Sequence, residues 1–186
     1  MITTILNYLA NSGAITYIVL ALLSIYLIVT IWIFFYRYFA VTALIKNEVK
    51  SLESLTSREA RFSSLSALNK CTTNTSSKEL LYACEINIIK DASSGISWLA
   101  IISSTSPFIG LFGTVIGILE SFAKFANQSK VAFAIIAPAI SEALVATAAG
   151  IFVAIFAYTF HQILSRKIYE LNIYLKAQAQ ILIAKG

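Results

Sequence analysis

Three long stretches without charged residues divide the chain. A continuous apolar run from Ile15 to Tyr36 has about the 20 residues that a helix needs to cross a bilayer. A second uncharged run extends from Ala92 to Leu119, and a third extends from about Val131 to Leu164, interrupted only by Glu142. This pattern predicts three membrane-spanning helices.

The third run is longer than a membrane requires. At about 1.5 Å per residue it reaches roughly 50 Å, whereas the hydrocarbon core is roughly 30 Å thick. No glycine or proline occurs between Gly150 and Gly186 to end a helix. We therefore expect the third helix to leave the membrane and to continue through Arg166 towards Ala184.

The segment between the first two spans predicts a helical hairpin. One helix should run out of the first span to about Leu68, and a polar stretch follows over residues 69–77. Ser76 and Glu79 have the spacing of a capping box, so a second helix should begin near Ser77 and return into the second span.

Lysine and arginine residues predict the orientation. Eight of them lie between spans one and two, four lie in the C-terminal tail, and only two, Lys124 and Lys130, lie between spans two and three. By the positive-inside rule the N-terminus is outside, and the middle segment and the tail are cytoplasmic. Cys71 and Cys84 then face a reducing compartment without a CxxC spacing, so we expect two reduced thiols.

These elements predict an all-α polytopic membrane protein with three transmembrane helices that extend into the cytoplasm, and with a cytoplasmic helical hairpin. The predicted order is a periplasmic N-terminus with the first transmembrane helix, the hairpin, the second transmembrane helix, a short periplasmic loop, the third transmembrane helix and a cytoplasmic C-terminal helix; these parts cover residues 1–36, 37–97, 98–125, 126–131, 132–165 and 166–186.

Composition supports a membrane protein and argues against soluble classes. Of the 186 residues 58% are hydrophobic and 12% are charged, about half the charged share usual in soluble domains. The net charge of +5 comes from residues between the apolar runs, which indicates topology and argues against nucleic-acid binding. No nucleophile and base, metal-ligand spacing or cofactor motif can be assembled, so we expect neither an enzyme nor a cofactor.

Small and polar residues share one face of the second span. Gly110, Gly113, Thr114 and Gly117 fall within a sector of about 120°. Close helix packing at the three glycines is the simplest interpretation. Packing does not require charged residues, yet Glu120 and Lys124 follow at a spacing of four; they form either an interfacial ion pair or part of a transport pathway.

The third span carries a carboxyl group near mid-membrane. If the span begins near Val131, Glu142 lies about 17 Å inside it. A charge there costs at least about 2.5–3.5 kcal/mol, so such groups face a bundle interior or a wet cavity. Glu142 is either a protonated hydrogen-bonding group between helices or a proton site helped by the hydroxyls of Thr114 and Thr147. Gly150 lies further along the same span, in the sector of small residues that favours close helix packing.

Two segments resemble the MotA/TolQ/ExbB proton-channel family, on its TolQ/ExbB branch and slightly closer to TolQ. They read SSTSPFIGLFGTVIGILESF (Ser103–Phe122) and APAISEALVATAAGIFVAIFAY (Ala137–Tyr158), within a resemblance that covers about Trp98 to Leu164. The resemblance implies that Thr114, Glu142 and Thr147 line the pore. Ala139 replaces a family glycine, and Phe156 replaces a family proline, so a helix kink expected there should be missing.

The resemblance also implies an assembly and a role. Family members form homopentamers in the bacterial inner membrane around the spans of two copies of an ExbD- or TolR-like partner, which brings a protonatable aspartate. Proton flow then drives a TonB- or TolA-like protein that acts on the outer membrane, in protein or substrate import or in envelope maintenance. The alternatives are a self-contained small ion channel or transporter, which would conduct without a partner, and a structural membrane scaffold.

Overall fold

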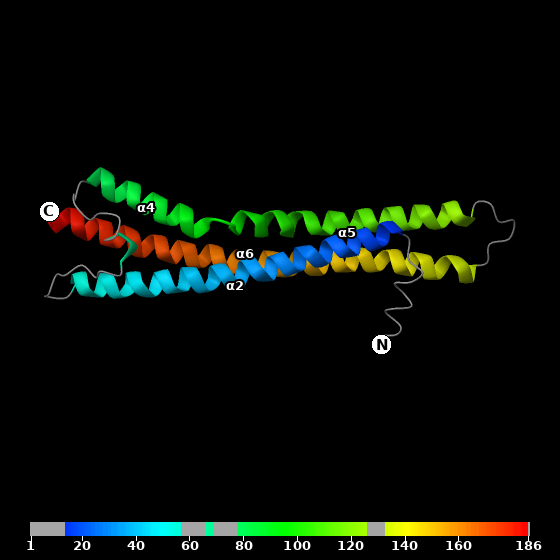
Figure 1. The fold of residues 1–186 in the computed structure, drawn as a ribbon, viewed down its shortest axis with the longest axis horizontal. Helices are drawn as coiled ribbons and strands as arrows, with labels where there is room; N and C mark the ends of the chain where they lie inside the picture. Colours follow the sequence, from blue (N-terminus) through cyan, green and yellow to red (C-terminus); the bar gives the residue numbers. More distant parts are fainter. Residues whose placement is uncertain (1–13, 57–65, 69–77, 126–132, 186) are drawn as a thin grey trace. The chain divides into compact units, whose positions relative to one another are not determined.

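The computed structural model describes four ranges of the chain, which are residues 14–56, 66–68, 78–125 and 133–185, and most of their residues are helical (Figure 1). Four helices occur in these ranges and no strand does, so the all-α prediction is confirmed; they are α2 (Ala14–Thr56), α4 (Lys78–Ser93), α5 (Ile96–Phe125) and α6 (Phe133–Lys185). Three stretches of these described ranges are long and apolar enough to cross a membrane: Ile15–Leu55, Ile96–Ala123 and Ala143–Ala184.

Helix α6 is a single helix of 53 residues. It passes through Phe156 and Arg166 without a break. Helix α2 contains neither glycine nor proline over its 43 residues, which removes the two residue types least compatible with a helix interior. Both long helices therefore follow from sequences that lack interior breakers over most of their length.

The predicted hairpin differs from the structure at its first helix. Helix α2 ends at Thr56, and Ser66 lies outside any helix, so the helix does not run unbroken to Leu68. The backbone N–H of Ala67 donates instead to Oε1 of Glu48 at 2.6 Å. A side-chain acceptor on α2 thus fixes the chain near residue 66. The second helix begins at Lys78, and Ser76 and Ser77 lie outside the described residues.

The return into the second span is broken, contrary to the sequence prediction. Helix α4 ends at Ser93 and α5 begins at Ile96, because Gly95 has a φ of 84°, in the left-handed region that glycine adopts readily. The carbonyl oxygen of Asp91 accepts hydrogen bonds from the backbone N–H of Ser94 (3.3 Å) and from Nη1 of Arg37 on α2 (3.2 Å). Arg37 thus places a cation at the C-terminal end of α4, where the helix dipole favours it.

Close contacts divide the chain into two units, and each has its own apolar core. The first unit comprises residues 1–31 and 98–159, and the second comprises residues 32–97 and 160–186. The core of the first unit includes Leu23, Ile102, Ala146 and Ala157 from three helices.

The core of the second unit joins α2, α4 and α6 and includes Val41, Leu81, Leu171 and Leu175. Cys84 also belongs to this core and is disulfide-bonded, so the expectation of a reduced thiol is wrong for Cys84. That expectation came from the predicted compartment and the CxxC spacing alone. Cys71 lies outside the described residues.

Candidate functional site

Helices α5 and α6 of the first unit touch through their glycines. A Cβ atom added to Gly150 would lie 2.5 Å from the carbonyl oxygen of Ser106, and one added to Gly110 would lie 2.7 Å from the carbonyl oxygen of Ala146. Real Cβ atoms do not approach other atoms so closely. Glycine at these two positions therefore lets the two backbones meet directly, as small residues do in membrane helix pairs.

The other two glycines of α5 face side chains of α2 and α6. A Cβ atom at Gly113 would lie 2.9 Å from Cγ1 of Val19 on α2, and one at Gly117 would lie 3.1 Å from Cβ of Ala143 on α6. Gly113 is thus close to both neighbouring helices, because Cβ of Ala146 would also be only 3.1 Å away. The small-residue face of α5 is the face that packs against α2 and α6.

Two threonine hydroxyls meet at the centre of this contact. Oγ1 of Thr114 on α5 and Oγ1 of Thr147 on α6 are joined by a short hydrogen bond, in which either hydroxyl can be the donor. Both atoms also lie 3.2 Å from the carbonyl oxygen of Gly110, and Thr114 Oγ1 lies 3.2 Å from the carbonyl oxygen of Ala143. Thr114 is buried and Thr147 is half-buried.

This cluster has more acceptors than protons. Each hydroxyl has one proton to donate and can accept two hydrogen bonds. If Thr147 donates to Thr114, then Thr114 donates to a carbonyl oxygen; if the direction reverses, Thr147 donates to Gly110. The two arrangements use the same atoms, so the direction of the hydrogen-bond chain can reverse without moving a helix.

Of the remaining predicted site residues, the structure describes the side chain of Glu120 and the backbone alone of Glu142 and Lys124. Glu142 belongs to α6, one residue before the Ala143 carbonyl that Thr114 approaches, but its side chain lies outside the part that the structure describes. The side chain of Lys124 is outside that part as well. Glu120 is half-buried and forms no ion pair with another described residue. The structure thus brings together Thr114, Thr147 and the glycines.

A buried polar network in the second unit was missed by the sequence analysis. Glu48 on α2 is completely buried, and its Oε2 accepts hydrogen bonds from Oγ of Ser66 and from Nε2 of Gln178 on α6, both at 2.9 Å. Nε2 of Gln178 also donates to the carbonyl oxygen of Glu48 at 2.8 Å. Neither the spacing nor the composition of these three segments distinguishes Glu48 from the exposed glutamates around it.

The described residues hold no cluster of three or more His, Cys, Asp or Glu that could bind a metal ion. Within the described part of the chain, three buried hydroxyls on α2 have no hydrogen-bond partner: those of Thr30, Thr42 and Ser51. The chemistry of the described site is therefore that of hydroxyls and backbone carbonyls in the contact between α5 and α6.

Long apolar helices that pack through glycines around buried hydroxyls define a polytopic membrane protein with a polar interior. Residues 50–177 match the MotA/TolQ/ExbB proton channel family. That match covers more than half of the chain, and the chain belongs to this family.

Individual relatives match over different lengths. The chain is 42% identical over 188 residues, covering both chains completely, to a Helicobacter pylori protein named as an ExbB-like 1 biopolymer transport protein. It is 47% identical over 79 residues to the biopolymer transport protein ExbB of Pseudomonas putida, which covers 42% of this chain and 24% of that one. It is 53% identical over 58 residues to the Tol-Pal system protein TolQ of Pseudomonas aeruginosa. That match covers 31% of this chain and 25% of the TolQ chain.

Proposed function

We propose that the chain is the channel subunit of a proton-driven motor in the bacterial inner membrane. It assembles as a homopentamer around two copies of an ExbD- or TolR-like single-span partner and drives a TonB- or TolA-like protein that acts on the outer membrane. The observation that supports this role best is the hydrogen-bonded pair Thr114–Thr147, buried where α5 meets α6. The name of the full-length relative supports biopolymer transport as the process that is energised.

The proposed orientation places the N-terminus in the periplasm and the C-terminus in the cytoplasm. Twelve of the 14 lysine and arginine residues then lie on the cytoplasmic side. The positive-inside rule supports this arrangement, and residues 126–131 become a short periplasmic loop.

The proposed proton path includes Glu142, Thr114 and Thr147. The carboxyl group of Glu142 takes up and releases the proton, and the two hydroxyls relay it by reversing the direction of their hydrogen bonds. The carbonyl oxygens of Gly110 and Ala143 hold these hydroxyls in place at 3.2 Å. Each proton that crosses the full membrane potential supplies about 2.3 kcal/mol per 100 mV, so several protons are needed for each mechanical step.

The test replaces Glu142 and measures the function and the complex in the same cells. We expect Glu142→Gln and Glu142→Ala to abolish energy-dependent outer-membrane function while the amount of purified oligomer with its partner stays near the wild-type level. Glu79→Gln, at an exposed glutamate on α4, is the matched control and should retain function. Full activity of Glu142→Ala at normal complex levels would refute the proton role and favour a scaffold.

A second measurement separates the motor from a self-contained channel. The purified chain is reconstituted alone into liposomes with a proton gradient, and internal pH is followed by a fluorescent dye. The motor subunit should give a proton leak close to that of empty liposomes until the partner is added. Rapid, Glu142-dependent conduction by the chain alone would favour the self-contained channel.

A further inference from the structure

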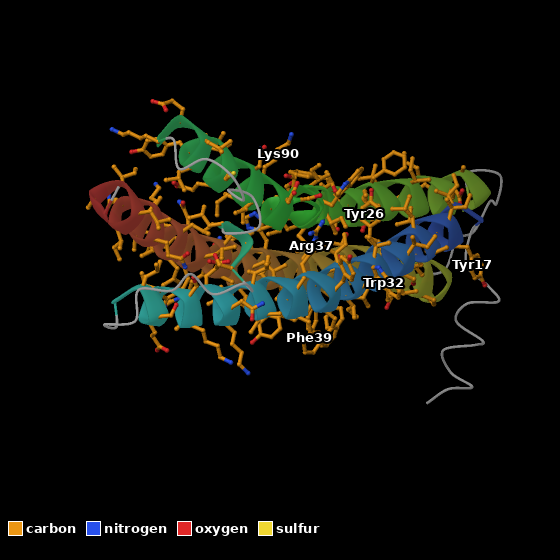
Figure 2. All side chains as sticks on the ribbon, turned by 60° about the vertical axis from the view of Figure 1, so that its left-hand side comes forward. Tyr17, Tyr26, Trp32, Arg37, Phe39 and Lys90 are labelled. Carbon is orange, nitrogen blue, oxygen red and sulfur yellow. The ribbon has the colours of Figure 1, made fainter. Side chains whose placement is uncertain are left out.

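Helices α2 and α6 carry matching rows of buried or half-buried residues in the second unit. On each helix these residues recur at spacings of four, three and four, which is the heptad pattern of helices that pack along a shared seam. The row on α2 is Val41, Ile45, Glu48 and Leu52, and the row on α6 is Leu171, Leu175, Gln178 and Leu182. The core of this unit includes members of both rows. Phe39 lies outside the α2 row, is exposed, and is directed away from the neighbouring helices in Figure 2.

The two helices run in the same direction along this seam. Phe34 stacks on Phe160, and further along both helices Glu48 bonds Gln178. Glu48 and Gln178 are 130 positions apart, and the same offset relates every other member of the α2 row to its counterpart on α6.

The apolar members of the rows do not by themselves select this alignment. A heptad row repeats itself, so apolar residues would again meet apolar residues if α2 moved along α6 by seven residues, about 10 Å. The core of the first unit likewise joins α2 and α6 through apolar residues such as Leu23 and Val153. Apolar helices in a membrane associate without a hydrophobic driving force, so these contacts favour one alignment only weakly.

Each row contains one polar residue, and the two polar residues bind each other. Nε2 of Gln178 donates to Oε2 of Glu48 at 2.9 Å and to its carbonyl oxygen at 2.8 Å. The carboxyl group of Glu48 also accepts hydrogen bonds from Oγ of Ser66 at 2.9 Å and from the backbone N–H of Ala67 at 2.6 Å. Glu48, Ser66 and Gln178 are completely buried, and no lysine or arginine among the described residues forms an ion pair with Glu48. Three donors from outside α2 therefore satisfy one buried carboxyl group.

A network of this kind is an unfavourable way to stabilise a core. A buried carboxyl group loses its hydration, and well-packed apolar residues in its place often give equal or greater stability. A single polar position in an apolar heptad seam is known instead to specify register. The network is therefore better suited to select an alignment than to add stability.

A shift by one heptad would break the pair in either direction. One shift places Glu48 against Leu171. The same shift places Gln178 against Leu55, and the opposite shift places Gln178 against Val41. In both cases the amide of Gln178 would be buried against an apolar side chain without its partner, which is strongly unfavourable.

We propose that Glu48 and Gln178 form a register key, which is the polar pair that holds α2 and α6 of the second unit in one alignment. Ser66 and Ala67 bind the same carboxyl group, so the key also fixes the chain at residues 66–68, where Leu68 is buried in the core of this unit. This role does not depend on the proposed channel function, because it concerns the alignment of helices within one folded chain.

The test measures the alignment by photo-cross-linking of the purified full chain. The photoreactive residue p-benzoylphenylalanine is placed at position 34, because Phe34 stacks on Phe160 with ring centroids 4.0 Å apart. Irradiation bonds this side chain to the α6 residues that it contacts, and mass spectrometry of the peptides identifies them. With the key intact, the attachment sites should lie within one turn of Phe160. A shift by one heptad should move them to the turn around Val153 or Lys167.

The variant Glu48→Leu with Gln178→Leu replaces the key by an apolar pair. We expect the share of attachment sites displaced by seven residues to rise at least tenfold over the wild type. The midpoint of unfolding in sodium dodecyl sulfate should be no lower than that of Gln178→Leu alone, which leaves Glu48 facing a leucine. The exchange Glu48→Gln with Gln178→Glu is the matched control, because it keeps a carboxyl group opposite an amide, and it should keep the single set of sites near Phe160.

Three results would overturn the register key. A single set of sites near Phe160 in Glu48→Leu with Gln178→Leu would leave the network a role in stability alone. Loss of the folded chain in that variant, with the exchange variant folded, would show that the network is required for folding. Displaced sites in the wild type or in the exchange variant would show that the polar pair does not select the alignment.

Discussion

Replacing Gly150 with alanine adds a methyl group where the backbone of α5 already lies. The new Cβ atom would be 2.5 Å from the carbonyl oxygen of Ser106 and 3.0 Å from Cα of Gly110, whereas ordinary contacts begin near 3.4 Å. The two helices must therefore separate by about 1 Å. Overpacking of this kind costs about 1–3 kcal/mol, and the hydrogen bond between Thr114 and Thr147 contributes about 0.5–1.5 kcal/mol more when it is lost.

We therefore expect Gly150→Ala to lower the free energy of unfolding by about 2–4 kcal/mol and to reduce coupling. Unfolding is measured by circular dichroism during titration of the detergent-solubilised protein with sodium dodecyl sulfate. Gly117→Ala is the matched control, because its Cβ atom would meet Ala143 at 3.1 Å and Thr16 at 3.6 Å, so it should cost less than about 1 kcal/mol. Equal losses in both variants, or no loss in Gly150→Ala, would refute the close contact.

Three further predictions concern the hydroxyl pair, the buried glutamate and the topology. Thr147→Val should weaken energy coupling at unchanged complex levels, because it removes the hydroxyl that bonds Thr114, whereas Thr147→Ser should retain coupling in the same outer-membrane assay. Glu48→Ala should lower the free energy of unfolding by about 1–3 kcal/mol for each donor left unpaired, and the exposed Glu53→Ala should change it little; equal effects would contradict the network. In a topology test, a membrane-impermeant thiol reagent should label Glu53→Cys only in inverted vesicles and Gln128→Cys only in intact spheroplasts, and the reverse pattern would overturn the orientation.

The long helices could be predicted because their signals are local. Uncharged runs predict the three spans. The absence of glycine and proline between Gly150 and Gly186 predicts that α6 continues beyond the third span. The break between α4 and α5 could not be predicted in the same way, because a single glycine is tolerated inside many helices. Only the structure shows Gly95 at positive φ with Arg37 bound beside it.

The site divides in a similar manner between local and distant information. The resemblance selects Thr114 and Thr147. Their hydrogen bond depends on the register in which α5 packs against α6, and the composition of a helix face does not determine that register. Gln178 donates a hydrogen bond to Glu48, which lies 130 positions earlier in the sequence. No hydrophobic periodicity relates two residues so far apart. Contacts between distant segments are therefore where the structure adds most.

The joint at Gly95 has a mechanical consequence for the four helices. A continuous helix transmits twist along its length, because each turn is tied to the next by backbone hydrogen bonds. Helices α2 and α6 keep that connection over 43 and 53 residues, so each resists twisting along its own length. Between α4 and α5 the connection is interrupted at Ser94 and Gly95, so these two helices are not tied to each other in this way. The chain thus combines two long continuous helices with one pair of helices that is separated at a glycine.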